Sequence, residues 1–290
     1  MAAIGSHSAF VSQFSILSLS ERLEFYFRHI ANALSVSGKL RKPIIMTKLK
    51  KLVRRTVLIF LLVIPVSGFA HFILFPQQTR SILIDYSDFK RDGRLYFNSN
   101  TPQNKVDTVK SIMELASNRV AAFWGLKTCT PKFIYCNSDE DFKKFGSPFP
   151  VPALTHIKLG AYIVMSIHGV DLDIIAHEIS HAELYERIGF YNWSFKIPRW
   201  FDEGLAMQSD NRNYYSEDTL KLKSNNYKNL PDVKKLKSGK QFNEEGSLEQ
   251  IVLNYMTAKH VVKNWHTKEK LDKFIRDINS GKTFEEAFGQ

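Results

Sequence analysis

His177-Glu178-Ile179-Ser180-His181 is the stretch from which most of this chain can be interpreted. On a helix, residues four apart lie one above the other on the same face, so both imidazoles can reach one metal ion. Zinc accepts imidazole nitrogens well, and a catalytic zinc site keeps one position for water. Glu178 lies beside that position, where its carboxylate can take a proton from the water. The motif therefore predicts two metal ligands, His177 and His181, and a general base.

The residues around this motif predict a buried helix. Asp171 or Asp173 can cap its start, and Gly189 can end it. Its apolar residues spread around much of the circumference: Leu172, Ile174, Ile175, Ile179, Ala182, Leu184 and Ile188. Burying two unpaired histidines would be costly, whereas burying two ligated ones would not. The alternative is a helix whose histidines are satisfied by solvent or by neighbouring groups.

A third ligand is expected from a second helix. Pro198-Arg199-Trp200-Phe201-Asp202-Glu203-Gly204-Leu205-Ala206 places an acid inside an apolar, helix-like stretch. Pro198 suits the first turn of a helix, where its missing N–H costs nothing. Glu203 follows His181 by 22 residues. Two histidines and a glutamate are a known catalytic zinc set, so we expect Zn²⁺ as the cofactor and Glu203 as its third ligand.

The order H-E-x-x-H and then W-x-x-E-G-x-A resembles the gluzincin metallopeptidases, and most closely the peptidase MA-like family of bacterial membrane or secreted hydrolases. The resemblance implies a zinc metallopeptidase that hydrolyses a peptide or protein substrate, with Glu178 as the catalytic base. It also implies an α+β, zincin-like domain with a small mixed sheet, an active-site helix and C-terminal helices. The G-A-M-E-N-like segment of gluzincin aminopeptidases is not found before His177, which favours an endopeptidase or a specialised hydrolase.

Further site residues are implied by the resemblance. Related gluzincins stabilise the oxyanion with a Tyr or a His; Tyr255 is the first candidate and His260 the second, although burial statistics favour an ordinary semi-buried residue at each position. The strand before the zinc helix, at residues 160–167, is expected to form the edge of the substrate cleft, where an extended peptide can add to it. Asp202 and Glu183 can each orient a ligand histidine or be a solvated acid.

Residues 57–75, VLIFLLVIPVSGFAHFILF, contain no Asp, Glu, Lys or Arg. About twenty apolar residues span a bilayer as a helix. The basic flank lies on the N-terminal side, so the N-terminus should stay in the cytoplasm while the rest crosses. We expect a single-pass anchor in a bacterial inner membrane, with the catalytic domain periplasmic or extracellular. The alternatives are a signal peptide cut after Gly68 and Ala70, and a buried core helix.

Three parts of the chain are expected. Residues 1–45 form a cytoplasmic tail, or are spurious if translation starts at Met46; residues 46–76 form the basic flank and anchor, or signal peptide; residues 77–290 form the metallopeptidase domain. Residues 1–55 carry ten Lys and Arg against two Glu, which is +8 of the net charge of +11. The basic charge thus belongs mainly to the flank, and we expect no nucleic-acid partner.

Local patterns predict several other elements. Strands are expected at residues 81–86, 94–97 and 132–136, helices at residues 20–33, 106–125, 248–265 and 271–278, and a short helix at residues 281–288. Pro148, Pro150 and Pro152 indicate a loop. Cys129 and Cys136 form either a disulfide, if the domain is exported, or two unpaired cysteines in the core.

Two other functions compete with the peptidase. One is a non-catalytic module of the cell envelope that keeps a zinc-peptidase-like fold for binding or assembly. The other is a structural envelope protein with a coincidental motif, which predicts no metal. The presence of Glu178 favours the enzyme, because retention of zinc alone would not require a base.

Overall fold

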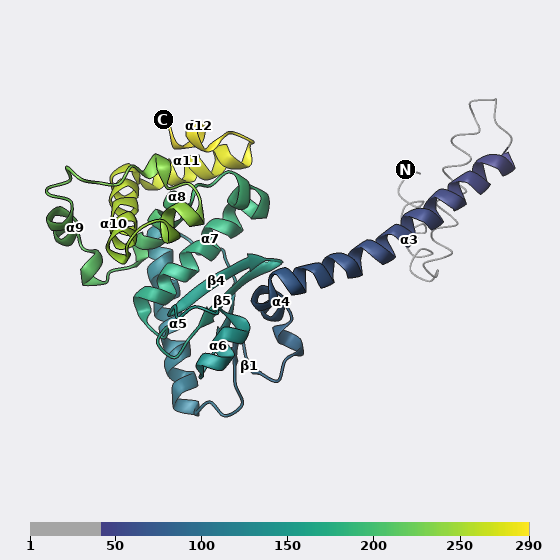
Figure 1. Cartoon of the computed structure of the whole chain (residues 1–290), viewed down its shortest axis with the longest axis horizontal. Helices are drawn as coiled ribbons and strands as arrows, with labels where there is room; N and C mark the ends of the chain where they lie inside the picture. The colour runs from purple at the N-terminus through teal and green to yellow at the C-terminus, as the bar shows by residue number, and fades with distance from the viewer. Residues whose placement is uncertain (1–41, 290) are drawn as a thin grey trace, which may run out of the picture. The chain divides into compact units, whose positions relative to one another are not determined.

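The computed structural model describes residues 42–289 of the chain (Figure 1). The chain divides into two units, one that ends at His71 and one that begins at Phe72. The helix expected at residues 20–33, and most of the tail expected at residues 1–45, lie outside the described residues.

The first described element is α3 (Lys42–Leu74), a helix with Pro65 inside it. Its segment Leu49–Leu74 is long and apolar enough to cross a membrane, and its most apolar part is not buried. A helix in the core of a globular domain would bury such side chains. This finding does not favour the alternative of a buried core helix.

The second unit is a mixture of helices and strands. Its helices are α4 (Pro76–Ile82), α5 (Gln103–Trp124), α6 (Asp139–Phe145), α7 (Leu172–Phe195), α8 (Arg199–Ala206), α9 (Glu217–Lys223), α10 (Leu248–Trp265), α11 (Lys268–Asn279) and α12 (Phe284–Phe288). Its strands are β1 (Lys90–Asp92), β2 (Leu95–Phe97), β3 (Lys132–Tyr135), β4 (Ala153–Lys158) and β5 (Gly160–Met165). The described part of the chain is thus an α+β fold with one small sheet.

The five strands form one sheet in the order β1-β2-β3-β5-β4. The central strands β2, β3 and β5 are parallel, with Phe133 opposite Leu95 on one side and Ile163 on the other. The outer strands β1 and β4 run antiparallel to their neighbours. The prediction of a small mixed sheet is confirmed.

The strand at the edge of the sheet beside α7 is β4. Residues 160–167 were expected to form the edge of the substrate cleft, where a peptide could add as a further strand; that is wrong, because β5 already has a strand on each side, β3 and β4. The three prolines before residue 153 made this region look like a loop, although none of them lies inside β4. Gly160 has a φ of 121°, which lets the chain turn back at once so that Lys158 pairs with Gly160.

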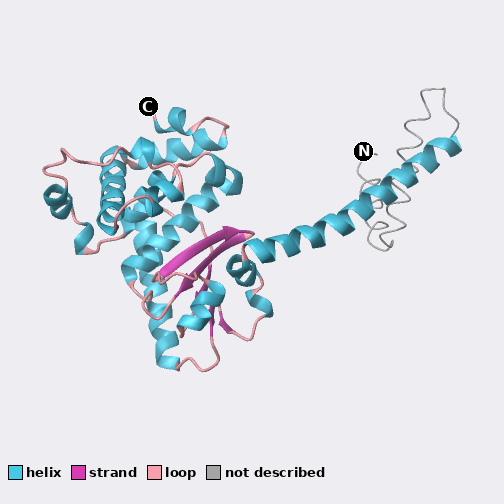
Figure 2. Cartoon of the chain, viewed as in Figure 1, coloured by secondary structure: helices cyan, strands magenta, loops and turns pink. Residues whose placement is uncertain are grey.

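The sheet is buried on both faces (Figure 2). Successive side chains of a strand point to opposite faces. Phe133 and Ile163 therefore join the larger core, with residues of α5 and α7, whereas Ile134 and Val164 join the smaller core, with residues of α6. On the helical side, α8 and α11 pack against α7, and α10 packs against α8.

The two cysteines lie in different cores. Cys129 belongs to the larger core and Cys136 to the smaller one, with β3 between them in sequence. Both thiols are unpaired and buried. Of the two alternatives, the one with two unpaired core cysteines is confirmed.

The prediction of a strand at residues 81–86 is wrong. These residues lie in α4 and in a 3-10 turn, η1 (Ile84–Tyr86). A short apolar run fits a helix or a strand equally well, and Pro76 at the first helical position favours the helix. Buried Ser81 then donates a hydrogen bond of 2.9 Å to the carbonyl oxygen of Phe145, which ties α4 to α6.

The other local predictions agree with the structure within a few residues at each end. The strands expected at residues 94–97 and 132–136 are β2 and β3. The helices expected at residues 106–125, 248–265, 271–278 and 281–288 are α5, α10, α11 and α12. These segments have strong local periodicity or caps, which is why their prediction needed no knowledge of distant contacts.

Candidate metal centre

The two histidines of the motif lie on a buried part of α7. Asp171 caps this helix, because its carboxylate accepts hydrogen bonds from the backbone N–H groups of Asp173 and Ile174. His177 and His181 are both buried, at 8% and 5% exposure. The predicted cap and the predicted buried helix are confirmed, and the helical path breaks at Gly189 before it continues to Phe195.

Glu203 reaches the histidines from α8, which follows Pro198 directly. The start of α8 is held where the N–H of Arg199 donates to the carbonyl oxygen of Lys237 at 2.8 Å. Its far end continues into a 3-10 turn, η2 (Met207–Ser209), whose Ser209 hydroxyl lies 3.2 Å from that of Ser180 on α7. Glu203 is thus presented by a helix that is held at both ends.

Gly204 lets α8 lie close against α10. A Cβ atom built at this position would lie 2.7 Å from the carbonyl oxygen of Ala258 and 2.6 Å from a methyl carbon of Val262. Real Cβ contacts are not that short, so the packing leaves room only for glycine. The glycine that follows Glu203 in the sequence therefore has a structural role, since it sets the distance between the two helices.

We expect Gly204→Ala to lower the free energy of unfolding by about 1–3 kcal/mol, the usual cost of overpacking. It should also weaken metal binding, because the displaced helix carries Glu203. Denaturant unfolding and metal titration would measure both effects. Gly239→Ala is the matched control, since a Cβ there meets nothing within 4 Å and φ is −56°. Equal stability of the two variants would contradict the close packing described here.

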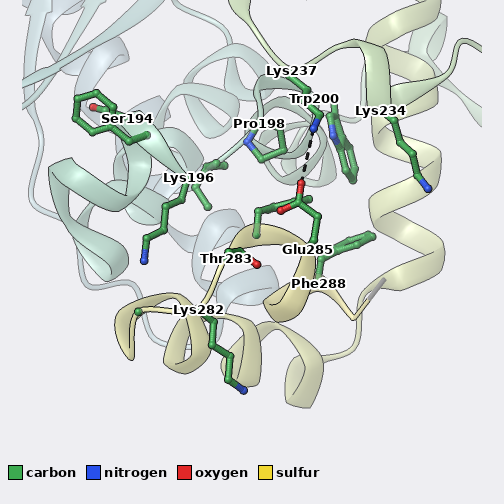
Figure 3. A pocket seen from close by; sticks show the side chains of 14 residues that line it. Ser194, Lys196, Pro198, Trp200, Lys234, Lys237, Lys282, Thr283, Glu285 and Phe288 are labelled. Atoms are coloured by element: carbon green, nitrogen blue, oxygen red, sulfur yellow. Dashed lines mark ion pairs between the residues drawn. The ribbon is translucent and has the colours of Figure 1, made fainter.

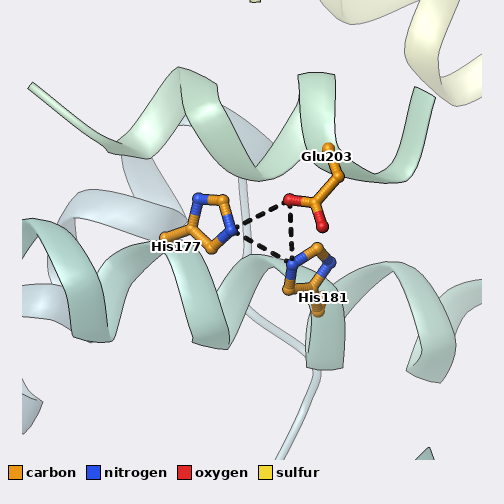
Figure 4. Close-up of side chains that lie close together, drawn as sticks. All are labelled: His177, His181 and Glu203. Carbon is orange, nitrogen blue, oxygen red and sulfur yellow. Dashed lines mark hydrogen bonds and ion pairs between the residues drawn. The ribbon is translucent and has the colours of Figure 1, made fainter. Parts of the chain in front are cut away.

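Three donor atoms meet between α7 and α8 (Figure 4). The Nε2 atoms of His177 and His181 are 3.2 Å apart. Oε2 of Glu203 lies 3.1 Å from Nε2 of His177 and 3.6 Å from that of His181. The three residues predicted as ligands therefore form one cluster, and this buried group could bind a metal ion.

The oxygen at the centre of this cluster fits a metal ligand. Oε2 of Glu203 is fully buried and makes no hydrogen bond, although two imidazole nitrogens are near it. An unsatisfied buried carboxylate oxygen is costly. A cation between the three donors would satisfy this oxygen and both nitrogens at once. The residues present therefore fit a bound metal.

Asp202 orients His181. Its Oδ1 lies 2.8 Å from Nδ1 of His181, and the side chain is buried. With one proton on Nδ1 facing this carboxylate, Nε2 is directed to Glu203 and His177 and is the atom that can bind a metal once its own proton is lost. Metal-ligating histidines are commonly held in this way. Of the two readings left open for Asp202, the structure supports the orienting one.

Glu183 has a different role. It is completely buried, and its oxygens accept hydrogen bonds from the N–H groups of Thr128 and Cys129 and from the Thr128 hydroxyl. Arg187, one turn later on α7, donates to it at 2.8 Å. Burial raises the pKa of Glu183, but these hydrogen bonds outweigh burial and lower it. Glu183 is neither a solvated acid nor a partner of His181; it ties the segment before β3 to α7.

Arg199 balances the acids of the cluster. Its guanidinium pairs with Oε1 of Glu203 and lies 3.2 Å from Oδ2 of Asp202. Burial raises the pKa of Glu203, but Arg199 and then His181 hold it well below its usual value. Glu203 is therefore ionised, with one oxygen engaged by Arg199 and the other directed to the histidines.

Glu178 lies beside the cluster and contacts β4. The hydroxyl of Thr155 lies 2.7 Å from Oε2 of Glu178 and 3.0 Å from its backbone oxygen. The side chain is buried, at 8% exposure. The candidate base is thus held by the edge strand of the sheet, which leaves its other oxygen, Oε1, for a substrate or a water molecule.

The two candidates for stabilising an oxyanion lie in different surroundings. The ring of Tyr255 is 6.4 Å from that of His177, centroid to centroid, and 4.9 Å from that of Phe242. Nδ1 of His260 instead donates a 2.7 Å hydrogen bond to the Glu217 carboxylate, and its ring stacks on that of Tyr227. Tyr255 therefore borders the cluster, whereas the contacts of His260 join α10 to α9.

Arg199 and Thr155 were not foreseen as site residues. Arg199 stands four residues before Glu203, so the i,i+4 rule for charged pairs on a helix was a usable signal. Thr155 gave no local signal, because its contact with Glu178 depends on the pairing of β4 with β5. Comparisons add no further residue: no protein-family model matches the chain, and no curated protein has a significantly similar sequence.

Metal uptake near pH 7 should release about one proton per ion bound. Burial lowers the pKa of His181, but the carboxylates of Asp202 and Glu203 outweigh burial and raise it to about 10. The imidazole is therefore protonated at pH 7, and Nε2 must lose that proton to bind a metal. Calorimetric titration in buffers of different ionisation enthalpy would count the protons. Uptake without any release would contradict this protonation state.

Proposed function

We propose that the chain is a membrane-anchored zinc metallopeptidase of the gluzincin type, similar to the peptidase MA-like family. The observation that carries this proposal is the convergence of His177, His181 and Glu203 beside an acid, Glu178, that is not itself part of the donor cluster. A site that only stored a metal would need the three donors but not the neighbouring carboxylate.

Zinc is the metal that suits this donor set best. Bonds of about 2.0–2.1 Å in a tetrahedral zinc site place ligand atoms about 3.3–3.4 Å apart. The three separations here are 3.1, 3.2 and 3.6 Å. Calcium and magnesium prefer oxygen ligands, whereas two imidazoles and one carboxylate suit zinc and leave a fourth position open. The geometry therefore supports a catalytic rather than a closed structural site.

Glu178 is the proposed general base. When bound, zinc polarises a carbonyl group and makes a water molecule more acidic. Because Thr155 engages Oε2 of Glu178, Oε1 is the atom that takes the proton of the attacking water. Glu178 then gives that proton to the amine that leaves as the peptide bond breaks. The side chain of Glu178 is mostly buried, which limits its contact with bulk water.

Tyr255 is the proposed donor to the oxyanion. Burial, and then the Glu203 carboxylate, raise the pKa of Tyr255 well above its usual value. The phenol therefore keeps its proton over the whole physiological range and can donate a hydrogen bond to developing negative charge. Its packing against Phe242 restricts the ring on the side of α10 that faces His177.

We propose that α3 anchors the enzyme in the cytoplasmic membrane of a bacterium. The segment Leu49–Leu74 has the length and composition of a membrane span. The lysines and arginines at its N-terminal end favour a cytoplasmic N-terminus. The zincin-like domain from residue 77 onward would then lie in the periplasm or outside the cell.

Metal analysis and a cleavage assay on the full chain test this function. The chain purified in detergent should contain about one zinc ion. It should also cleave members of a mixed peptide library, and chelation should abolish cleavage until zinc is restored. Bound zinc with no cleavage would favour the non-catalytic envelope module. A folded chain that binds no metal would overturn the proposal.

A further inference from the structure

An exposed aromatic face lies on α7 beyond Gly189. Gly189 has φ 75° and ψ 165°, so the helical path is interrupted there. After it, Tyr191 and Phe195 are 67% and 72% exposed, and their ring centroids are 5.2 Å apart. Phe190 is 40% exposed. Scattered exposed apolar residues are ordinary, but three exposed aromatic rings within six residues of one helix indicate an interaction surface.

Lys158 joins this aromatic face to the residue that follows the apolar helix. Its ammonium group lies 5.6 Å from the ring centroid of Phe190 and 5.0 Å from that of Phe75. Phe75 comes directly after Leu74, the last residue of α3. If α3 spans a membrane, chain connectivity alone places Phe75 at the membrane surface. Phe190 lies near the same ammonium group, so it is then close to that surface too.

A basic pocket lies next to the aromatic face (Figure 3). It has a volume of about 770 Å³, and Phe195 is among its lining residues. Its charged lining residues are four lysines and one acid: Lys196, Lys234, Lys237, Lys282 and Glu285. Glu285 lies 3.7 Å from Lys237, and Asp277 lies 2.9 Å from Lys282, so the positive excess comes from Lys196 and Lys234. This side of the domain therefore combines aromatic rings with cations.

We propose that this side of the domain docks on an anionic lipid surface, that of the membrane in which α3 is anchored. The lipid-facing surface comprises Lys158, Phe190, Tyr191, Phe195, Lys196 and Lys282. The inference rests on the anchor proposed above, and it does not depend on the metal or on catalysis. It adds a second, reversible membrane contact to the permanent one.

Two general effects support lipid as the occupant. Aromatic side chains favour the level of the lipid headgroups, where a ring is partly apolar and partly wet. Lysines near an anionic surface are attracted over about a Debye length, roughly 8–10 Å. The covalent link through Phe75 keeps the surface close to the bilayer, so docking is effectively intramolecular.

An environment-sensitive fluorophore at residue 191 tests the proposal. Tyr191→Cys is labelled with a nitrobenzoxadiazole dye in the full chain, where the native Cys129 and Cys136 are at most 1% exposed. The chain is placed in vesicles of phosphatidylcholine alone, or of phosphatidylcholine with phosphatidylglycerol. We expect blue-shifted emission and quenching by nitroxide lipids in the anionic vesicles, both reduced by salt.

The matched control is Leu222→Cys, which is 83% exposed but lies on α9. Its label should stay in water in both kinds of vesicle. Combined Lys158→Glu, Lys196→Glu and Lys282→Glu substitutions should return the residue 191 label to water. A water-exposed label in anionic vesicles, in a chain that resists alkaline extraction, would overturn the proposal.

Two other outcomes also decide against it. Shielding of the label in detergent that increases with protein concentration would assign the surface to a second copy of the chain. Extraction of the chain by alkali would refute the anchor and this inference together. The zinc content of the same sample would still test the metallopeptidase separately, so the two failures can be told apart.

Discussion

A Glu178→Gln chain should bind zinc like the wild type and lose at least about 10²–10⁴-fold in the rate of peptide hydrolysis, the usual contribution of a general base. The amide keeps the size of the side chain and its contact with Thr155, but it cannot accept the proton of the attacking water. His177, His181 and Glu203 are untouched, so the metal should remain. Steady-state hydrolysis and metal analysis of the same preparation would measure both properties.

Glu186→Gln is the control for this experiment. Glu186 lies on the same helix and is exposed to solvent, so its loss removes the same charge without touching the cluster. Its turnover should match that of the wild type. If Glu178→Gln turned over substrate at the wild-type rate, the proposed role of Glu178 would be wrong even if zinc were present.

The second large effect is expected at Glu203. Glu203→Gln should weaken zinc binding by more than about 10–100-fold, the range typical for loss of an outer partner of a ligand. The substitution removes the anionic oxygen that faces both imidazoles and leaves Arg199 opposite a neutral amide. Arg199 still has Asp202 as a partner, which should preserve the fold. Competition with a coloured chelator at constant pH would give the affinity.

Asp202→Asn and Glu217→Gln provide a graded comparison. Asp202 orients His181 without entering the cluster, so its variant should lose about 10–100-fold in zinc affinity. Glu217 pairs with His260 away from the cluster, and its variant should bind zinc normally. If the Glu203→Gln chain bound zinc with wild-type affinity, Glu203 would not be a metal ligand.

The parts of the site that could be predicted are those encoded by spacing along a single helix. His177, Glu178 and His181 are neighbours on one helical face whatever the rest of the chain does. Glu203 was predictable because its own helix has a clear start at Pro198. The sequence spacing does not predict how these two helices pack. In the structure their donor atoms lie within 3.6 Å of one another, and this depends on tertiary contacts.

The errors have other causes. The edge strand β4 was missed because its identity comes from pairing with β5, and the prolines before it suggested a loop. The role of Thr155 was missed with it. The helix at the start of the second unit was taken for a strand because a short apolar run does not separate the two periodicities. Long-range pairing decided the first two cases, whereas the third was decided by a local signal, Pro76 at the start of the helix.

The proposed site at His181 and the proposed lipid contact at Tyr191 are only ten residues apart, on either side of the break at Gly189. Eight helical steps of 1.5 Å and two extended steps place the two at most about 20 Å apart along the chain. An extended chain covers that length in about six residues. An enzyme docked in this way would select the bond to cleave by its distance from the membrane. A substrate protein anchored in the same bilayer would be cleaved at a fixed distance above the lipid, and its side chains at the cleavage site would matter less.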